Sequence, residues 1–300
     1  MQEIISVSCS LFSVLWCFVV AAFVAYVVSN RKKDGGGGGL GGPPGGASLP
    51  TGPVLPVKWP LGKDESPWYF IAAKQGTGIK VVNGAFVFPI KKGLYGSKSG
   101  DYFKANPNKV FPAERVTMSY SVYFPEGFDW VKGGKLPGVC FSSKPLECST
   151  GGEWSPDSGS FRVMFRENGA AIGYAYFSGA SGEAAFARQS AAVKAVGKVK
   201  GGAGIDLWHA KNDTDLRLNA GQWNTISFSI KLNTPNSADG TLSLTVNNRT
   251  KTLDGISWRT DASIKFNHVI FVTFFGGGSS EWASKKDTEI SFKDVGIAAS

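Results

Sequence analysis

Cysteine and histidine are scarce in this sequence, with four cysteines and two histidines in 300 residues. Cys9 and Cys17 lie in an apolar run near the N-terminus, so only Cys140 and Cys148 belong to the rest of the chain. These two thiols lack the further Cys or His partners of a structural zinc site, and we expect no metal. They lie in one glycine- and serine-rich segment, either as a disulfide or as a coincidental pair.

Long stretches with an apolar residue at every third or fourth position are also missing after residue 60, which argues against a helical domain. Apolar and polar residues instead alternate, as in strands with one buried face. The alternating segments are 116–124, 226–232, 242–246 and 290–292. The run HVIFVTFF at 268–275 is apolar on both sides and predicts a central strand. We therefore predict an all-β sandwich of two antiparallel sheets.

One segment departs from this pattern. Residues 183–203 are alanine-rich and basic, and they predict a short helix or a mobile loop with solvated lysines. The two histidines, His209 and His268, are expected to be structural or surface residues.

Acidic residues are too few to balance the basic ones, and the formal net charge is +9. Such a charge attracts polyanions, which include nucleic acids, anionic lipid surfaces and acidic polysaccharides. Five consecutive glycines at 35–39 are not followed by the Gly-Lys-Ser/Thr of a phosphate-binding loop. We expect no cofactor and no nucleic-acid partner.

The N-terminal run from Ile4 to Ser29 contains no charged residue. At about 1.5 Å per residue, a helix of residues 4–29 can cross a bilayer core of about 30 Å. A cleaved signal peptide is the alternative, but the apolar run is long and no basic residue precedes it. Basic residues at 31–33 follow it, so the positive-inside rule predicts a single-pass protein whose C-terminal part lies on the cytoplasmic side.

These features divide the chain into three parts. Residues 1–33 form a transmembrane anchor with a basic flank, and residues 34–57 form a Gly/Pro-rich linker. Residues 58–300 form the folded domain.

Several long motifs occur in a fixed order in this domain. From Pro125 the chain reads PEGFDWVKGGKLPGV, then SFRVMFRENGAAIGYAYF, LNTPNSADGTLSL and FVTFFGGGSSEW. In this order residues 110–300 resemble polysaccharide lyase family 14, which includes alginate and glucuronan lyases, several of them from large DNA viruses of algae. The resemblance implies a β-jelly-roll sandwich and cleavage of a polyuronate by β-elimination.

The resemblance also places five catalytic positions on this chain: Lys135, Ser160, Arg162, Tyr174 and Tyr176. Elimination needs a cation to offset the substrate carboxylate, and Arg162 beside Lys135 suits this role. It also needs a base and an acid. Lys135 or one of the tyrosines is the expected base, the other tyrosine protonates the leaving oxygen, and Ser160 orients the substrate.

Side-chain alternation puts Ser160 and Arg162 on one strand face and Phe161 and Val163 on the opposite, core-facing side. The turn RENGA then decides where the tyrosines point. A two-residue Asn168-Gly169 loop would set Val163 opposite Tyr174 and bury the tyrosines, whereas a three-residue loop would set Arg162 opposite Tyr176. The enzyme hypothesis requires the odd loop or a bulge.

A second hypothesis is a catalytically inactive, membrane-anchored structural or glycan-binding virion protein. In a virus with an internal membrane, its domain would lie on the capsid-facing side, with capsid proteins as partners. The first hypothesis expects a polyuronate as partner, and both expect the lipid bilayer to hold residues 4–29.

Overall fold

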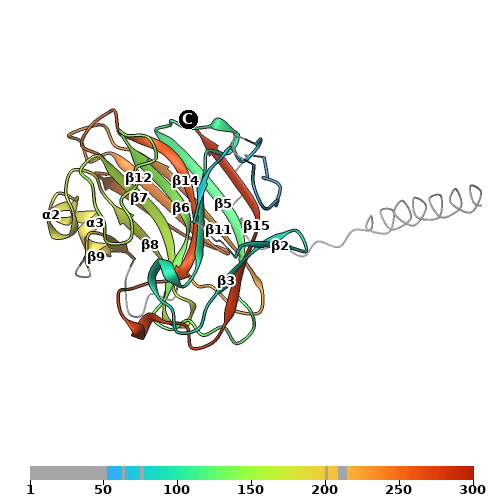
Figure 1. The fold of residues 1–300 in the computed structure, drawn as a ribbon. Coiled ribbons are helices and arrows are strands. Elements are labelled where there is room, and N and C mark those ends of the chain that lie inside the picture. Colours follow the sequence, from blue (N-terminus) through green and yellow to red (C-terminus); the bar gives the residue numbers. More distant parts are fainter. Residues whose placement is uncertain (1–52, 63–64, 75–77, 200–201, 209–214) are drawn as a thin grey trace, which may run out of the picture. The chain divides into compact units, whose positions relative to one another are not determined.

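Two antiparallel β-sheets pack face to face in the computed structural model (Figure 1). The structure describes residues 53–62, 65–74, 78–199, 202–208 and 215–300. Within these ranges no helix has the length and apolar character needed to cross a bilayer. The predicted membrane segment 4–29 lies outside the described residues, as does His209.

The first sheet has eight strands and carries the candidate site. Its strands follow the order β1 (Phe70–Ala73), β4 (Asp101–Ala105), β14 (Lys265–Phe275), β6 (Gly134–Ser142), β7 (Ser158–Phe165), β8 (Ala171–Tyr176), β10 (Ile205–Leu207) and β9 (Gly197–Val199). The strand predicted at 268–275 is confirmed as a central one, since β14 lies between β4 and β6.

The second sheet has seven strands and covers the other side of the core. Its order is β13 (Arg249–Ile256), β12 (Gly240–Val246), β11 (Trp223–Lys231), β5 (Arg115–Tyr123), β15 (Thr288–Ala299), β3 (Ala85–Ile90) and β2 (Lys80–Val82). The predicted all-β sandwich is therefore confirmed.

Helices in the described residues are short. The alanine-rich segment forms α2 (Gly182–Ala187) and α3 (Ala191–Val196) before it enters β9. In α3 the Ser190 hydroxyl caps the helix by accepting from the Val193 amide, while Lys194 is exposed as predicted. Single 3₁₀ turns make up the rest: η1 (Gly96–Lys98), η2 (Pro107–Lys109), η3 (Glu167–Gly169) and η4 (Ser280–Trp282).

The core between the sheets is filled by the inward residues of each alternating segment. On β11 Ile226, Phe228 and Ile230 are buried, whereas their sequence neighbours are only partly covered. Aromatic rings dominate the contact, and Phe103 stacks on Phe271 with centroids 4.9 Å apart. Each such buried side chain contributes about 2 to 3 kcal/mol by leaving water, so the sheet that carries the site has a rigid foundation.

The chain enters the sandwich before residue 58. The Leu55 amide donates to the Val295 carbonyl at 2.7 Å, and the Leu55 side chain is buried. The indole of Trp68 donates to the Pro56 carbonyl at 2.7 Å. Packing thus reaches into the end of the segment expected as linker.

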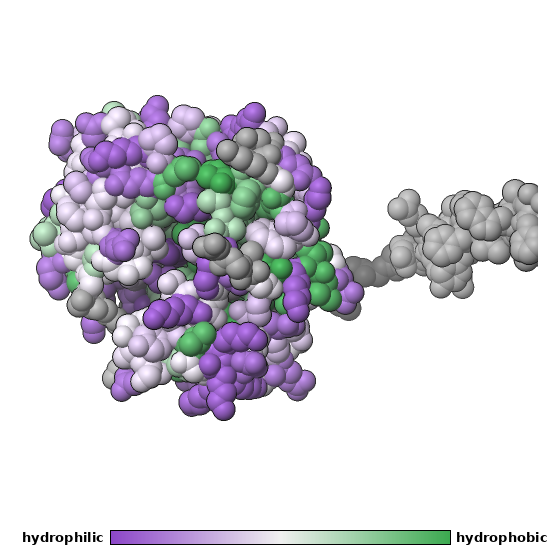
Figure 2. Space-filling model, in the orientation of Figure 1, coloured by the Kyte–Doolittle hydropathy of each residue, from purple (hydrophilic) through white to green (hydrophobic). Residues whose placement is uncertain are grey.

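The face of the molecule shown in Figure 2 is largely hydrophilic, with hydrophobic residues in patches.

Candidate active site

The hairpin between β7 and β8 sets the face of the tyrosines. Its loop has three residues, 167–169, because the Arg166 amide donates to the Ala170 carbonyl at 2.7 Å. Asn168 and Gly169 take the left-handed conformation that closes this turn, with φ of 57° and 76°. An odd loop puts both tyrosines on the face that carries Arg162, away from the core.

The register within this face differs from the prediction. Arg162 pairs with Tyr174, and Ser160 pairs with Tyr176. The expected pairing of Arg162 with Tyr176 is wrong because the loop ends one residue earlier than assumed. A shift of two residues leaves the side chains on the same face, so the predicted grouping survives.

Gly138, in the KGGKLPG motif, lies opposite Arg162 on the other neighbouring strand, β6. A Cβ at this position would lie 2.0 Å from the Phe161 carbonyl oxygen and 2.7 Å from Cγ of Arg162. Only glycine permits this approach, and the stem of Arg162 fills the space that a side chain would take. The motif glycine therefore has a direct role in placing Arg162.

Lys135 reaches the tyrosine pair from β6. Its Nζ lies 4.5 Å from the Tyr174 ring centroid and 5.9 Å from that of Tyr176. The Arg162 guanidinium lies about equally far from the two rings, at 6.0 Å from Tyr174 and 5.9 Å from Tyr176. Four of the five predicted residues therefore meet around one point, and the fifth, Ser160, is the strand partner of Tyr176.

Two of these residues are cations buried side by side. Lys135 is 6% exposed and Arg162 is fully buried. None of the three guanidinium nitrogens of Arg162 has a hydrogen-bond partner among the described residues. Burial lowers the pKa of Lys135 well below its ordinary value, and the charges of Arg162 and Arg166 lower it further. The site thus holds excess positive charge with little water, which favours an anionic ligand.

The tyrosine hydroxyls form a pair of their own. Oη of Tyr174 and Oη of Tyr176 are 3.2 Å apart, and the Gly152 amide donates to Tyr176 at 3.0 Å. Burial, and then the neighbouring Tyr176, raise the pKa of Tyr174 far above that of a free tyrosine. Tyr174 therefore keeps its proton at neutral pH, as a proton donor must.

Ser160 lies beneath the surface of the site. It is fully buried, and its hydroxyl donates to the Ser149 carbonyl at 2.6 Å. Ser149 belongs to the loop of residues 143–157 between β6 and β7, which also supplies Gly152. In this structure Ser160 holds that loop in place, so the predicted contact with substrate stays a prediction.

A groove of about 570 Å³ opens above the cations and the tyrosines. Its charged and aromatic lining residues are Lys135, Arg166, Tyr174, Tyr176, Asp206 and Trp282. Arg162 lies directly behind the rings of Tyr174 and Tyr176. Both tyrosines therefore face the groove.

Sequence reasoning missed the roles of three lining residues. One Nη of Arg166 lies 2.7 Å from both carboxylate oxygens of Asp206, and its guanidinium lies 5.8 Å from the Trp282 ring. Arg166 shares the strand face of Arg162, which was the available signal. Asp206 pairs with Tyr174 through the short strand β10, which no sequence pattern marked.

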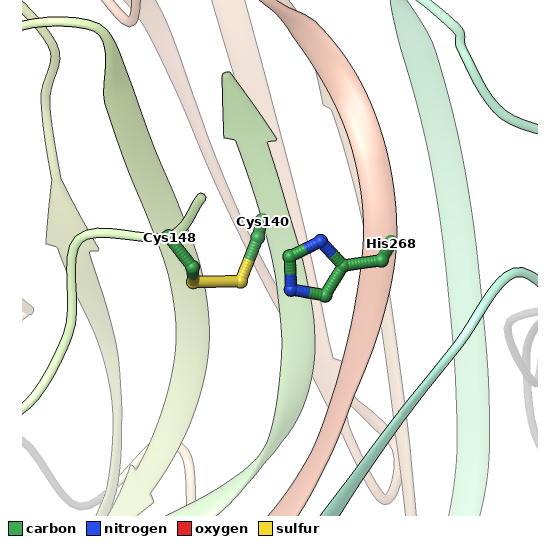
Figure 3. Close-up of side chains that lie close together, drawn as sticks. All are labelled: Cys140, Cys148 and His268. Atoms are coloured by element: carbon green, nitrogen blue, oxygen red, sulfur yellow. A yellow bond between two sulfur atoms is a disulfide. The ribbon is translucent and has the colours of Figure 1, made fainter. Parts of the chain in front are cut away.

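The cysteine pair in the domain is a disulfide, with Cα atoms of Cys140 and Cys148 5.3 Å apart. His268, expected to be structural or at the surface, is fully buried beside it (Figure 3). The Sγ atoms and a ring nitrogen of His268 all lie within 4.8 Å of one another. No histidine is near these cysteines in the sequence, but in the structure β14 brings His268 opposite Cys140. The expectation that the pair lacks a histidine partner is therefore wrong.

A family model for polysaccharide lyase 14 matches residues 82–295. The chain belongs to polysaccharide lyase family 14. The resemblance seen in the ordered motifs is thereby confirmed, and the match covers the strands that carry all five predicted site residues.

Solved structures of alginate lyases share the sandwich fold. The alginate lyase of Aplysia kurodai superposes with a TM-score of 0.65 at 23% identity, over 77% of this chain and 90% of that one. The alginate lyase vAL-1 of a Chlorella virus gives 0.61 at 22% identity, over 78% and 93%. The exolysin of Paramecium bursaria Chlorella virus 1 is 24% identical over 231 residues, or 70% of this chain. This match spans only 33% of the exolysin.

Proposed function

We propose that this family 14 domain cleaves a polyuronate by β-elimination. The observation that carries the proposal is the pair of buried basic side chains, Lys135 and Arg162, at the groove. A uronate carboxylate would bring the negative charge that these residues face, and its presence would offset the free-energy cost of burying them. A neutral sugar would leave that cost in place.

The two basic side chains also promote removal of the proton from the substrate. The reaction takes the proton from the carbon next to the carboxylate, and the charge that develops there spreads onto the carboxylate oxygens. Arg162 stays protonated at all relevant pH values and stabilises that charge. Lys135 has a lowered pKa, so it is available as the neutral amine that accepts the proton.

The tyrosine pair supplies the acid. Tyr176 accepts a hydrogen bond from the Gly152 amide, and in the proposed arrangement its own hydroxyl donates to that of Tyr174, 3.2 Å away. The hydroxyl of Tyr174 is then free to give its proton to the departing glycosidic oxygen, and Tyr176 holds it in place. The elimination thus ends with a broken C–O bond, an unsaturated sugar at the new chain end, Lys135 protonated and Tyr174 deprotonated. Transfer of the proton from Lys135 to Tyr174, directly or through water, restores both groups for the next turnover.

The substrate class is tested with the full chain on alginate and polyglucuronate. The unsaturated product absorbs ultraviolet light, so activity is followed by absorbance. Arg162→Ala is expected to abolish the signal, while Arg249→Ala, an exposed arginine of the other sheet, is the matched control. No absorbance on either polymer at neutral and alkaline pH would rule out the proposed reaction.

We further propose that residues 4–29 anchor the domain to a membrane, with the domain on the cytoplasmic or capsid-facing side. The support is the uncharged run followed by basic residues 31–33. Alkaline carbonate should leave the full chain in the membrane pellet, whereas release into the supernatant contradicts the anchor. Protease added outside sealed vesicles then reports which side carries the domain.

A further inference from the structure

His268 is a buried ring without a polar partner. Neither Nδ1 nor Nε2 has a hydrogen-bond partner among the described residues, although the side chain is fully buried. Leaving such a group unsatisfied is destabilising, so a packing role alone would favour an apolar residue here. Figure 3 shows the ring turned toward the sulfur atoms of Cys140 and Cys148.

We infer that Cys140, Cys148 and His268 form a binding site for a zinc-like divalent cation when the disulfide is reduced. Thiolate sulfur and imidazole nitrogen are the ligands that such ions prefer. The three ligand atoms lie within 4.8 Å of one another, close to the separations of about 3.5 to 3.8 Å in a tetrahedral site. A water molecule would occupy the fourth position.

The disulfide and the metal site exclude each other. A cellular or added thiol reductant gives two electrons and two protons to the disulfide, and the reductant is itself oxidised to a disulfide. Binding then releases the two thiol protons as the cation bonds to both sulfur atoms and to one ring nitrogen. On the proposed cytoplasmic side, where thiols are kept reduced, the metal-binding form is the relevant one.

The surroundings suit a neutral metal complex. Lys104 is the charged side chain that acts on His268. Two thiolates and one divalent cation sum to zero charge, so the bound ion adds no repulsion toward Lys104. The apolar residues Ile270 and Val272, on the same strand as His268, pack in one cluster with Cys140 and limit access of bulk water.

The site would fasten the loop of residues 143–157 to the sheet in either redox state. Cys148 lies in this loop, whereas Cys140 and His268 belong to strands β6 and β14. The next residue, Ser149, accepts from Ser160, and Gly152 donates to Tyr176. A reduced and metal-free chain would lose the side-chain cross-link that the disulfide makes between this loop and its sheet.

The test uses the full chain with Cys9→Ser and Cys17→Ser, so that Cys140 and Cys148 are its remaining thiols. Cobalt(II) serves as the probe because thiolate coordination gives intense ultraviolet and visible absorption. We expect one cobalt per reduced chain, displacement by zinc, and no binding to the oxidised chain. His268→Gln should weaken cobalt affinity at least about tenfold and change the visible bands, since one nitrogen ligand is lost.

Three outcomes would overturn the inference: no thiolate absorption in the reduced chain, equal binding by the oxidised chain, or an unchanged spectrum and affinity in His268→Gln. If the His268→Gln variant folds poorly, thermal melting of the reduced chain that retains His268 gives an independent measure. Zinc is expected to raise its melting temperature and magnesium to leave it unchanged, and equal melting with both ions contradicts the site. Neither measurement depends on lyase activity, so the metal site can be confirmed or excluded independently of the proposed reaction.

Discussion

The Nζ atom of Lys135 lies 4.5 Å from the centre of the Tyr174 ring, so the candidate base and the candidate acid touch each other. A protonated lysine is attracted to the ring face, which partly offsets its burial. The pKa values of the two groups, which are similar in free side chains, are pushed apart, because burial lowers that of Lys135 and raises that of Tyr174. Such opposed shifts mark an acid and base pair.

Replacing Lys135 by methionine should separate catalysis from stability. Activity should fall at least about 100-fold because the base is lost. A lysine with a lowered folded-state pKa destabilises the fold below its unfolded value of 10.5, and this penalty fades as pH rises toward that value. Lys135→Met removes the penalty, so at neutral pH the free energy of unfolding should rise by about 1 to 3 kcal/mol.

Urea unfolding and the ultraviolet assay measure the two effects. Lys80→Met, an exposed lysine on β2, is the matched control and should change neither quantity. A Lys135→Met variant that is clearly less stable than the parent would mean that the buried ammonium has stabilising partners.

Replacing Asp206 by asparagine should move the pH profile. The rate should rise with pH as Lys135 loses its proton, and the charge of Asp206 raises the pKa of that lysine. Asp206→Asn removes this effect and also frees Arg166 from its ion pair. The rising limb of kcat/KM against pH should therefore shift to lower pH. Asp254→Asn, on an exposed position of β13, should leave the limb in place, and a shift to higher pH contradicts the assignment.

Removing either hydroxyl of the tyrosine pair should have nearly the same effect. Tyr174→Phe removes the donor, and Tyr176→Phe removes the group that holds it at 3.2 Å. Each should lower kcat at least about 100-fold, and the double variant should lose little more because the pair acts as a unit. Tyr123→Phe on the other sheet is the control. Full activity in either single variant would exclude the shared-acid arrangement.

A methyl group at Gly138 should disturb both strands that meet there. In Gly138→Ala the new Cβ would lie 2.0 Å from the Phe161 carbonyl oxygen, so β6 and β7 must part. We expect a loss of about 2 kcal/mol or more in unfolding free energy and a lower kcat, because Arg162 is displaced. Gly278→Ala, where the added Cβ meets nothing within 4 Å, should fold normally. Equal stability of both variants would show that the strands adapt without cost.

Period-two alternation predicted which side chains face the core, and the ordered motifs predicted the site residues. The register between β7 and β8 could not be predicted from the sequence. It depends on whether the turn takes residues 167–169 or 168–170, a difference set by local backbone energies of Asn168 and Gly169. The Arg166–Asp206 pair depends on the placement of β10, which has three residues and no marked pattern. His268 meets Cys140 only because strands distant in sequence become neighbours.

The floor of the groove and its rim are built differently. Lys135, Arg162 and the tyrosines extend from strands that rest on a stacked aromatic core, whereas Gly151, Gly152, Gly277 and Gly278 come from connecting segments. Insertions or substitutions in those segments can change the surface that binds the substrate without moving the groups that carry out the reaction. Engineering of new substrate preferences should therefore begin at these glycine-bearing segments.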